Sequence, residues 1–337
     1  MKTDFTHLQA AHCENGVTTN LLQHAGVHQM TEPLAFGIGS GLFYIHIPLL
    51  KINDGPAIAF RTMPGLIFKR TCSLLDIDIE RKTFRSKEKA QEFLDECIKA
   101  NQPAGCQVGV YYLTYFPKEY RFHFNAHNLI VYGKEEDNYL VSDPVMETTT
   151  MLSSYELERV RFSKGPLAPN GQIYFPKEKK IVTEEQLKYA IKKGIKSNVR
   201  AMLYIPGSVA GVRGIKYTGE KIKKWRDKLG LKKAGIYLAQ LVRMQEEIGT
   251  GGGGFRFIYG AFLQQAHAYH SYDALLDASQ KFTKAGDLWR SAAVQASGIY
   301  KGRYSEQSDF NKMGDYLAEI SEIEKDAFKT LSKVKWN

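Results

Sequence analysis

The change from strand-like to helical patterning near the middle of the chain is the feature that most restricts its fold. Between residues 45 and 145, short runs rich in β-branched and aromatic residues alternate with turn residues, which is typical of strands. These runs cover residues 56–62, 107–113, 127–133 and 138–144. Residues 86–101 interrupt them with apolar residues at helical spacing. We therefore predict an α+β fold for this half.

After residue 176 the chain is helical in pattern almost to its end, and the preceding stretch, 164–176, contains several Pro and Gly residues. We expect two domains joined by a linker. The predicted boundaries are 1–155 for the α+β domain, 156–176 for the linker and 177–337 for a mainly α-helical domain.

Composition indicates an ordinary globular protein, since 43% of the 337 residues are hydrophobic and 24% are charged. No apolar run reaches the roughly 18 residues that a membrane helix needs, and the N-terminus lacks the apolar stretch of a signal peptide. We therefore expect a cytoplasmic protein without a membrane span. The four cysteines show no CxxC spacing, so reduced thiols are expected.

The net charge of +10 is concentrated between residues 177 and 233, which contain 17 basic and 5 acidic residues. Such a segment attracts an acidic partner, although it is also compatible with a solvated helix face. No helix-turn-helix, zinc or RNP-like pattern accompanies the lysines, so nucleic-acid binding is not predicted.

Cys13 is the first candidate for chemistry, because it directly precedes a helical pattern that Gly26 can end. A cysteine at a helix N-terminus is favoured as the thiolate by the helix dipole. The alternative is a small hydrophobic residue in a core.

A nucleophilic cysteine needs a base and a group that orients the base. His127 begins an apolar strand, and the chain then turns through KEEDN and returns as YLVSDP. This hairpin should bring Asp143 near His127, where its carboxylate could accept the Nδ1 proton of the imidazole. The chain order Cys, His, Asp is that of papain-like enzymes.

Four segments, in this order, resemble the butirosin biosynthesis protein H N-terminal family, which is similar to the bacteriocin double-glycine peptidases. They are HCENGVTTNLL, TEPLAFGIGSGLFYIHIP, VYYLTYF…FHFNAHNLIVYGK and LVSDP. In the helical half, IGTGGGGFRFIYGAFLQQA resembles the uncharacterised domain that commonly follows that family. The resemblance implies a papain-like cysteine-protease-type domain covered by a helical one.

The activity that this resemblance implies is acyl transfer. The donor would be an acyl thioester on the phosphopantetheine of an acyl carrier protein, and the acceptor an amine or hydroxyl of a small molecule. By position, Cys13 would be the nucleophile, His127 the general base and acid, and Asp143 the orienting residue. No permanently bound cofactor is implied.

In the related peptidases a glutamine several residues before the cysteine contributes to the oxyanion hole. Here His7 lies six positions back and Gln9 four back, so Gln9 and the backbone N–H of Cys13 are the candidates. FGIGSG could line the site or form a plain turn. The predicted lining residues are His12, Glu32, Gly37, Gly39, Ser40 and Gly41.

Two further features could contact the donor. The glycine run at 249–254 precedes a helix and could hold the phosphate of phosphopantetheine, or act as a hinge. Its candidate residues are Gly251, Gly252, Gly253, Gly254 and Arg256. The basic segment could dock the acidic carrier protein through Lys221, Lys223, Lys224, Lys228, Lys232 and Lys233.

Other functions remain open. His123 and His127 could form a metal pair with His12 and Cys13, but no clear fourth ligand is present and no metal site is predicted. Water as the acceptor would make the protein a peptidase, amidase or thioester hydrolase on the same scaffold. A noncatalytic binding protein that uses the basic helical face is the alternative from a different class. The sequence does not indicate the oligomeric state.

Overall fold

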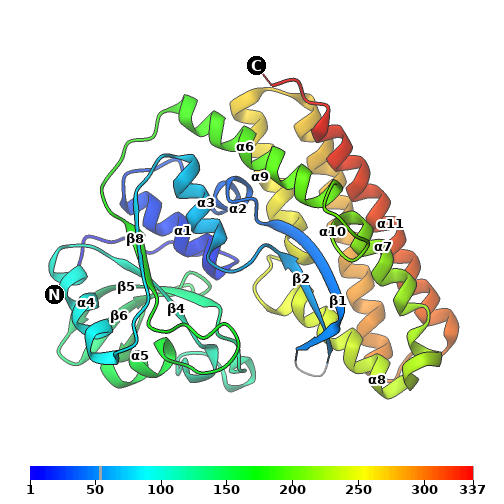
Figure 1. Ribbon diagram of the computed structural model, residues 1–337, viewed down its shortest axis with the longest axis horizontal. Helices are drawn as coiled ribbons and strands as arrows, with labels where there is room; N and C mark the ends of the chain where they lie inside the picture. Colours follow the sequence, from blue (N-terminus) through cyan, green and yellow to red (C-terminus); the bar gives the residue numbers. More distant parts are fainter. Residues whose placement is uncertain (53–54, 337) are drawn as a thin grey trace. The chain divides into compact units, whose positions relative to one another are not determined.

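The computed structural model describes residues 1–52 and 55–336, which form two compact units (Figure 1). The first unit comprises Met1–Ala35 and Ile67–Thr183, and the second comprises Phe36–Leu66 and Glu184–Asn337. Both units are therefore discontinuous in sequence, unlike the continuous domains expected at 1–155 and 177–337. The expected linker, 156–176, contains most of helix α5 (Ser154–Arg161) and strand β8 (Ile173–Pro176) of the first unit.

The first unit is built around a six-stranded antiparallel sheet with the order β3-β8-β4-β5-β6-β7. Its strands besides β8 are β3 (Ile79–Lys82), β4 (Ala104–Val108), β5 (His127–Glu135), β6 (Asn138–Ser142) and β7 (Thr150–Ser153). Its helices besides α5 are α1 (Cys13–His24), α3 (Leu66–Leu74) and α4 (Lys87–Lys99), and α2 (Glu32–Ile38) runs from the first unit into the second.

The two faces of this sheet are covered by different helices (Figure 1). Leu129 and Val131 of β5 belong to a buried apolar cluster with Leu94 of α4 and Leu157 of α5. Because side chains alternate along a strand, Asn128 projects to the other face, where its amide contacts Cys13 of α1. Helix α1 therefore covers the face of the sheet opposite this cluster.

Local sequence signals fixed several of these elements. Ser86 caps α4 by accepting a hydrogen bond from the N–H of Lys89, and Gly26 follows α1 with a φ of 98°. The predicted hairpin is confirmed, since Glu135 pairs with Asn138 and Ile130 with Ser142. Only the first residues of the run predicted at 107–113 are a strand, because Val110–Tyr112 form a 3-10 turn.

The second unit combines one hairpin with long helices. The hairpin consists of β1 (Leu42–Ile52) and β2 (Gly55–Arg61). The helices are α6 (Glu184–Leu203), α7 (Gly211–Ile222), α8 (Trp225–Val242), α9 (Arg256–His270), α10 (Asp273–Tyr300) and α11 (Gln307–Ser332). Short turns at Arg243–Glu247 and Gly253–Phe255 lie between α8 and α9.

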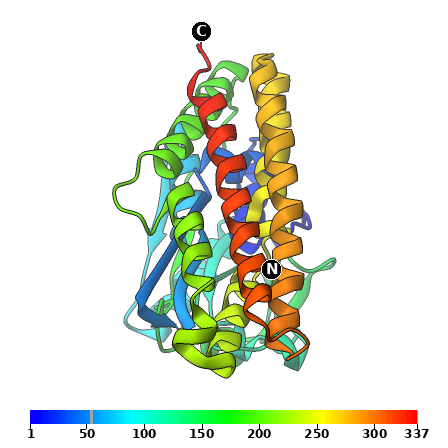
Figure 2. The same ribbon diagram turned by 90° about the vertical axis from the view of Figure 1, so that its right-hand side faces the viewer.

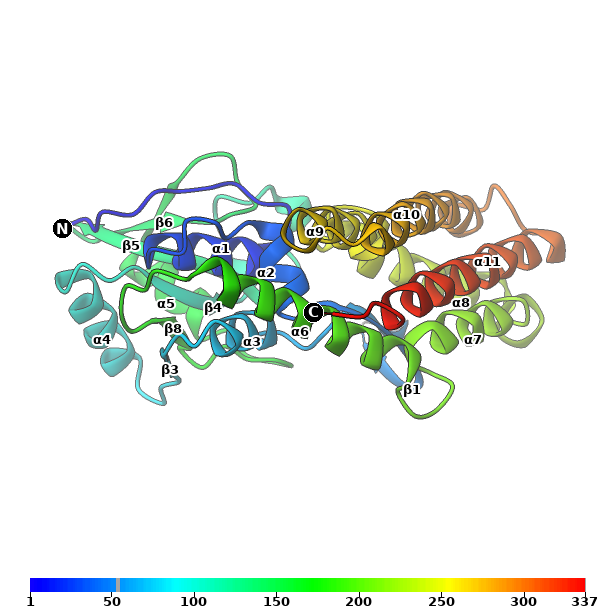
Figure 3. The same cartoon turned by 90° about the horizontal axis from the view of Figure 1, so that it is seen from above.

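Helices α10 and α11 lie side by side along most of their length (Figure 2). Helix α7 packs against α11, and α8 packs against α10 (Figure 3). Hydrogen bonds attach the hairpin to these helices: the Asn198 side chain donates to the Leu42 carbonyl, and the Tyr44 hydroxyl donates to Thr218. The hairpin is thus part of the helical unit, although its sequence lies in the strand-rich half.

Among the residues that the structure describes, no helix is long and apolar enough to span a bilayer.

Candidate active site

Cys13 is the first residue of α1, and its position is fixed by hydrogen bonds to the residues before it. The Glu32 carboxylate accepts from the N–H groups of Ala11 at 2.9 Å and His12 at 2.8 Å. The His12 ring caps the helix, since its Nδ1 accepts from the N–H of Asn15 at 3.3 Å. His12 and Glu32 therefore hold the turn that presents the cysteine, which is a supporting role.

His127 begins β5, and its Nε2 lies 2.7 Å from Oδ2 of Asp143, the residue that follows β6. The Cys13 sulfur lies close enough to the ring to contribute to its raised pKa. Because Nε2 is engaged by the carboxylate, Nδ1 is the nitrogen left for the sulfur. The sequence analysis assigned Nδ1 to Asp143, so the roles of the two nitrogens are the reverse of that expectation.

Cys13, His127 and Asp143 are 5%, 6% and 0% exposed, respectively. Burial alone would lower the pKa of His127, but the Asp143 carboxylate and the Cys13 sulfur raise the pKa to about 10. The ring is thus set to hold a positive charge beside the sulfur. The site has the layout of a papain-like, cysteine-dependent enzyme, with the cysteine at the start of a helix and the histidine on a strand of the sheet.

Tyr115 is a member of the site that the sequence analysis missed. Its hydroxyl donates to Oδ2 of Asp143 at 2.7 Å, and the N–H of Val145 donates to Oδ1 at 3.2 Å. Both oxygens of the buried carboxylate are therefore hydrogen-bonded, as a buried charge requires. Tyr115 lies in the aromatic run 111–116, where nothing in the sequence distinguishes it from a core residue.

The remaining three cysteines are also buried. Burial raises the pKa of the thiols of Cys72, Cys97 and Cys106, to about 12 for Cys97. Thiolate chemistry is disfavoured at these positions.

The side chain of Gln9, the predicted oxyanion residue, is exposed, and its role stays a prediction. His7, six residues before Cys13, contacts Ser142 Oγ at 2.7 Å and the Met146 carbonyl at 3.2 Å. His7 thus ties the N-terminal segment to the loop that contains Asp143.

The predicted lining residues Gly37, Gly39, Ser40 and Gly41 belong to the second unit. A Cβ at Gly37 would collide with the Phe262 ring, and one at Gly41 with the ring of Phe36. The Ser40 hydroxyl donates to the Gly194 carbonyl at 3.3 Å. These contacts give the glycines a packing role inside that unit.

The glycine run 249–254 already binds an anion from its own chain. The N–H of Gly253 donates to the Glu246 carboxylate at 3.1 Å, and that of Gly252 donates to Thr250. Arg256 is fully buried and forms two hydrogen bonds with Glu324, at 2.8 and 3.0 Å. Because its guanidinium is occupied in this way, Arg256 does not fit the predicted phosphate contact.

The backbone conformation and the packing of this run both favour glycine. Gly251, Gly252, Gly253 and Gly254 all have positive φ. A Cβ at Gly254 would collide with Phe60, and one at Gly253 would lie 2.9 Å from Gly286.

Most of the predicted docking lysines are available to solvent. Lys221, Lys224, Lys228, Lys232 and Lys233 are exposed on α7 and α8 and at the bend between them. Lys223 differs, since it pairs with Asp315 at 2.8 Å. The docking of an acyl carrier protein by these lysines remains a prediction.

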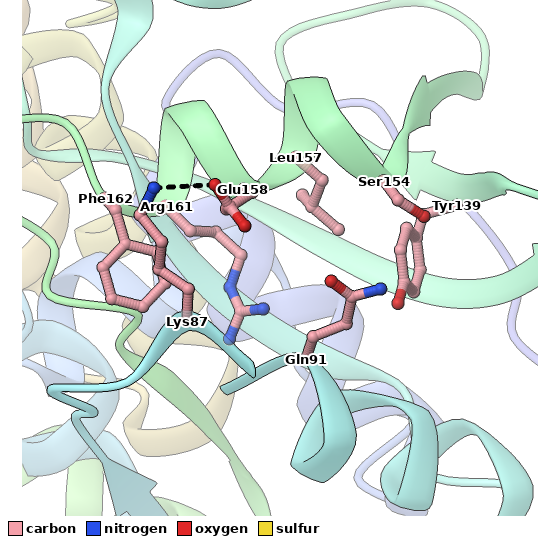
Figure 4. A pocket seen from close by; sticks show the side chains of 8 residues that line it. All are labelled: Lys87, Gln91, Tyr139, Ser154, Leu157, Glu158, Arg161 and Phe162. Carbon is pink, nitrogen blue, oxygen red and sulfur yellow. Dashed lines mark hydrogen bonds and ion pairs between the residues drawn. The ribbon is translucent and has the colours of Figure 1, made fainter. Parts of the chain in front are cut away.

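A small hollow of 10 Å³ between α4 and α5 contains none of the predicted site residues (Figure 4). The Lys87–Glu158 ion pair, 2.7 Å long, lies at its edge. The volume suits about one water molecule, so the hollow is not a substrate pocket.

No cluster of three or more potential metal ligands occurs in the part of the chain that the structure describes. His123 stacks on the ring of Tyr111, and His127 is engaged by Asp143.

The chain is similar to a solved structure and matches two family descriptions. A solved structure described as a C39-like peptidase from Bacillus anthracis is similar at 15% identity, over 53% of this chain and 100% of that one, with a TM-score of 0.36. Among curated proteins, none matches the chain. Residues 12–144 match the family described as Butirosin biosynthesis protein H, N-terminal, and residues 155–331 match Domain of unknown function (DUF4872). The second match spans more than half of the chain, so the chain belongs to the family described as Domain of unknown function (DUF4872).

Proposed function

We propose that the protein is an acyltransferase that moves an acyl group from the phosphopantetheine thioester of an acyl carrier protein to an amine or hydroxyl acceptor. The observation that supports it is the convergence of Cys13, His127 and Asp143 in a chain whose residues 12–144 match the butirosin biosynthesis protein H N-terminal family. The family is named for a biosynthetic protein, which favours transfer to a small molecule over protein degradation.

The first half-reaction acylates Cys13. The Sγ proton moves to Nδ1 of His127, and the thiolate attacks the thioester carbonyl. The oxyanion forms against the N–H of Cys13, which has no acceptor four residues back because it starts the helix. The bond to the pantetheine sulfur then breaks, and His127 returns a proton to that sulfur. One thioester replaces another, so this exchange is nearly balanced in free energy.

The second half-reaction releases the acyl group. An acceptor amine or hydroxyl attacks the acyl-Cys13 carbonyl and gives its proton to His127. The bond to Sγ breaks, and the sulfur takes the proton back from the ring. Asp143 keeps the ring oriented in both half-reactions and stabilises its positive charge.

The proposal is tested by incubating the protein with an acyl-carrier thioester and a panel of amines and alcohols. We expect amide or ester to form in multiple turnovers, with little free acid, and His127→Gln to remove this activity. Release of free acid alone at the same rate, with or without acceptors, would instead identify a thioester hydrolase. A peptide substrate that is cleaved while the thioester is ignored would identify a peptidase.

A further inference from the structure

Asn128 lies next to Cys13 and has no role in the reaction steps proposed above. Its side-chain nitrogen is 4.0 Å from Cys13 Sγ, within hydrogen-bonding reach of a sulfur, and the residue is 2% exposed. The same nitrogen donates to the Ala126 carbonyl at 3.1 Å. An amide nitrogen carries two hydrogens, so it can serve the carbonyl and the sulfur together.

The orientation of this amide follows from its neighbours. The Ala126 carbonyl can only accept, which requires nitrogen on that side of the Asn128 side chain. The amide oxygen then faces Tyr174, whose hydroxyl donates to it at 2.8 Å. Both polar ends of Asn128 are fixed, and one N–H remains for the sulfur.

Tyr174 is itself rigidly placed. It pairs with Gly105 across strands β8 and β4, and a Cβ at Gly105 would lie only 2.6 Å from the Tyr174 ring. The ring also packs on Phe68, with centroids 4.8 Å apart. Burial raises the pKa of the Tyr174 hydroxyl well above its ordinary value, and the nearby Glu14 carboxylate adds to this, so the hydroxyl remains a donor.

We propose that Asn128, held by Tyr174, is a second hydrogen-bond donor to the Cys13 sulfur and stabilises its thiolate together with His127. A hydrogen bond to a charged acceptor is stronger than one to a neutral acceptor. The Asn128 N–H therefore stabilises the thiolate more than the thiol or the acylated sulfur. The same hydrogen bond holds the sulfur in position while the His127 ring gains and loses its proton.

The test is the pH profile of Cys13 alkylation by iodoacetamide, followed by peptide mass spectrometry. This readout requires no acyl donor, so it is independent of the proposed acyl transfer, on which the catalytic meaning of Asn128 rests. We expect Asn128→Leu to move the midpoint of the profile upward by about one pH unit. At pH 6 its alkylation should be about tenfold slower than that of the wild type, with no loss at high pH.

Tyr174→Phe tests the orientation of the amide without removing it, and it guards against a folding defect in Asn128→Leu. It should shift the midpoint in the same direction by a smaller amount. Tyr132→Phe is the matched control, since Tyr132 is a buried tyrosine of β5 with no hydrogen bond to Asn128, and its profile should equal that of the wild type.

Folded Asn128→Leu and Tyr174→Phe proteins with the wild-type midpoint would overturn the inference, as would a rate loss that is equal at every pH. A shifted profile in a protein that forms no acyl adduct would leave the inference standing and remove the acyltransferase proposal.

Discussion

Asp143 raises the pKa of the His127 ring, because its carboxylate is buried and contacts the ring directly. The raised pKa of His127 makes stability depend on pH. A group with a raised pKa contributes stability that is complete below its unfolded value, here 6.5, and lost as the pH rises through the folded value of about 10.

Asp143→Asn removes the main influence that raises this pKa. We therefore expect the wild type to lose more unfolding free energy than Asp143→Asn between pH 6.5 and 10, while the two curves run parallel below pH 6. Urea denaturation at a series of pH values measures both curves. A constant difference across the whole range would contradict this assignment of charges.

Tyr115 is expected to hold the carboxylate in place. Tyr115→Phe keeps the ring and removes one donor to a buried charge, which should reduce the free energy of unfolding by about 1–3 kcal/mol. Tyr120→Phe is a suitable control because Tyr120 is 60% exposed, and it should change stability by less than about 0.5 kcal/mol. Equal stability of the two variants would mean that the hydroxyl of Tyr115 contributes nothing.

The positions of Cys13 at the start of α1 and of His127 at the start of β5 were predictable from the sequence, but their side-chain contacts were not. Cys13, His127 and Asp143 were recognisable because a helix start, a strand start and a hairpin return are visible in the pattern. Which imidazole nitrogen faces which partner depends on side-chain rotation, which no local pattern encodes. In the sequence, Tyr115 and Asn128 cannot be distinguished from ordinary core and strand residues. Their roles follow from tertiary contacts with Asp143 and with Cys13 of α1.

Among the elements, the contact between α1 and the turn after β6 is the critical one. Gly16 lies one helical turn after Cys13 and faces the Asp143–Pro144 segment. A Cβ there would lie 2.7 Å from Ala10 Cβ and closer still to Pro144 Cβ. The absence of a side chain at Gly16 thus lets the cysteine helix approach the loop that contains the carboxylate.

Gly16→Ala should therefore destabilise the protein by about 2 kcal/mol or more, although Ala in a helix is normally better than Gly by 0.5–1 kcal/mol. Cys13 alkylation should slow as the helix shifts. Gly235→Ala in α8 is the control. The atom nearest to a Cβ added at Gly235 would be Tyr300 Cα, 3.6 Å away, so this substitution should be neutral or stabilising. Thermal melts compare the two, and a stabilised Gly16→Ala protein would disprove the close approach.

Element type was largely predictable from the sequence, whereas the strand–turn boundary after residue 108 was not. The run 107–113 is uniformly apolar and aromatic, so its periodicity cannot distinguish a strand from a 3-10 turn.

For the whole molecule, the sequence predicted two parts but not how the chain is divided between them. Residues 36–66 look like part of the strand-rich half. Hydrogen bonds that span more than 150 residues, such as Asn198 to Leu42 and Tyr44 to Thr218, place them in the helical unit. Such long-range contacts leave no local signature.

The net charge of +10 predicts that salt weakens recognition of an acidic carrier protein, which kinetics can test. If the exposed lysines of α7 and α8 attract an acidic carrier protein, kcat/KM with the carrier-bound donor should fall about tenfold between 50 and 300 mM salt. A small acyl-pantetheine donor should change less than about twofold. Charge reversal at Lys224, Lys228 and Lys232 should reproduce the effect of high salt for the carrier-bound donor only. Equal salt dependence of both donors would argue against docking through these lysines.

The most direct measurement is the intact mass of the protein after brief exposure to an acyl-carrier thioester without acceptor, followed by peptide mapping. We predict one acyl group per chain, located on Cys13, absent in Cys13→Ala and strongly reduced in His127→Gln. No adduct on the wild type, or an adduct that persists in Cys13→Ala, would contradict the central role of this cysteine.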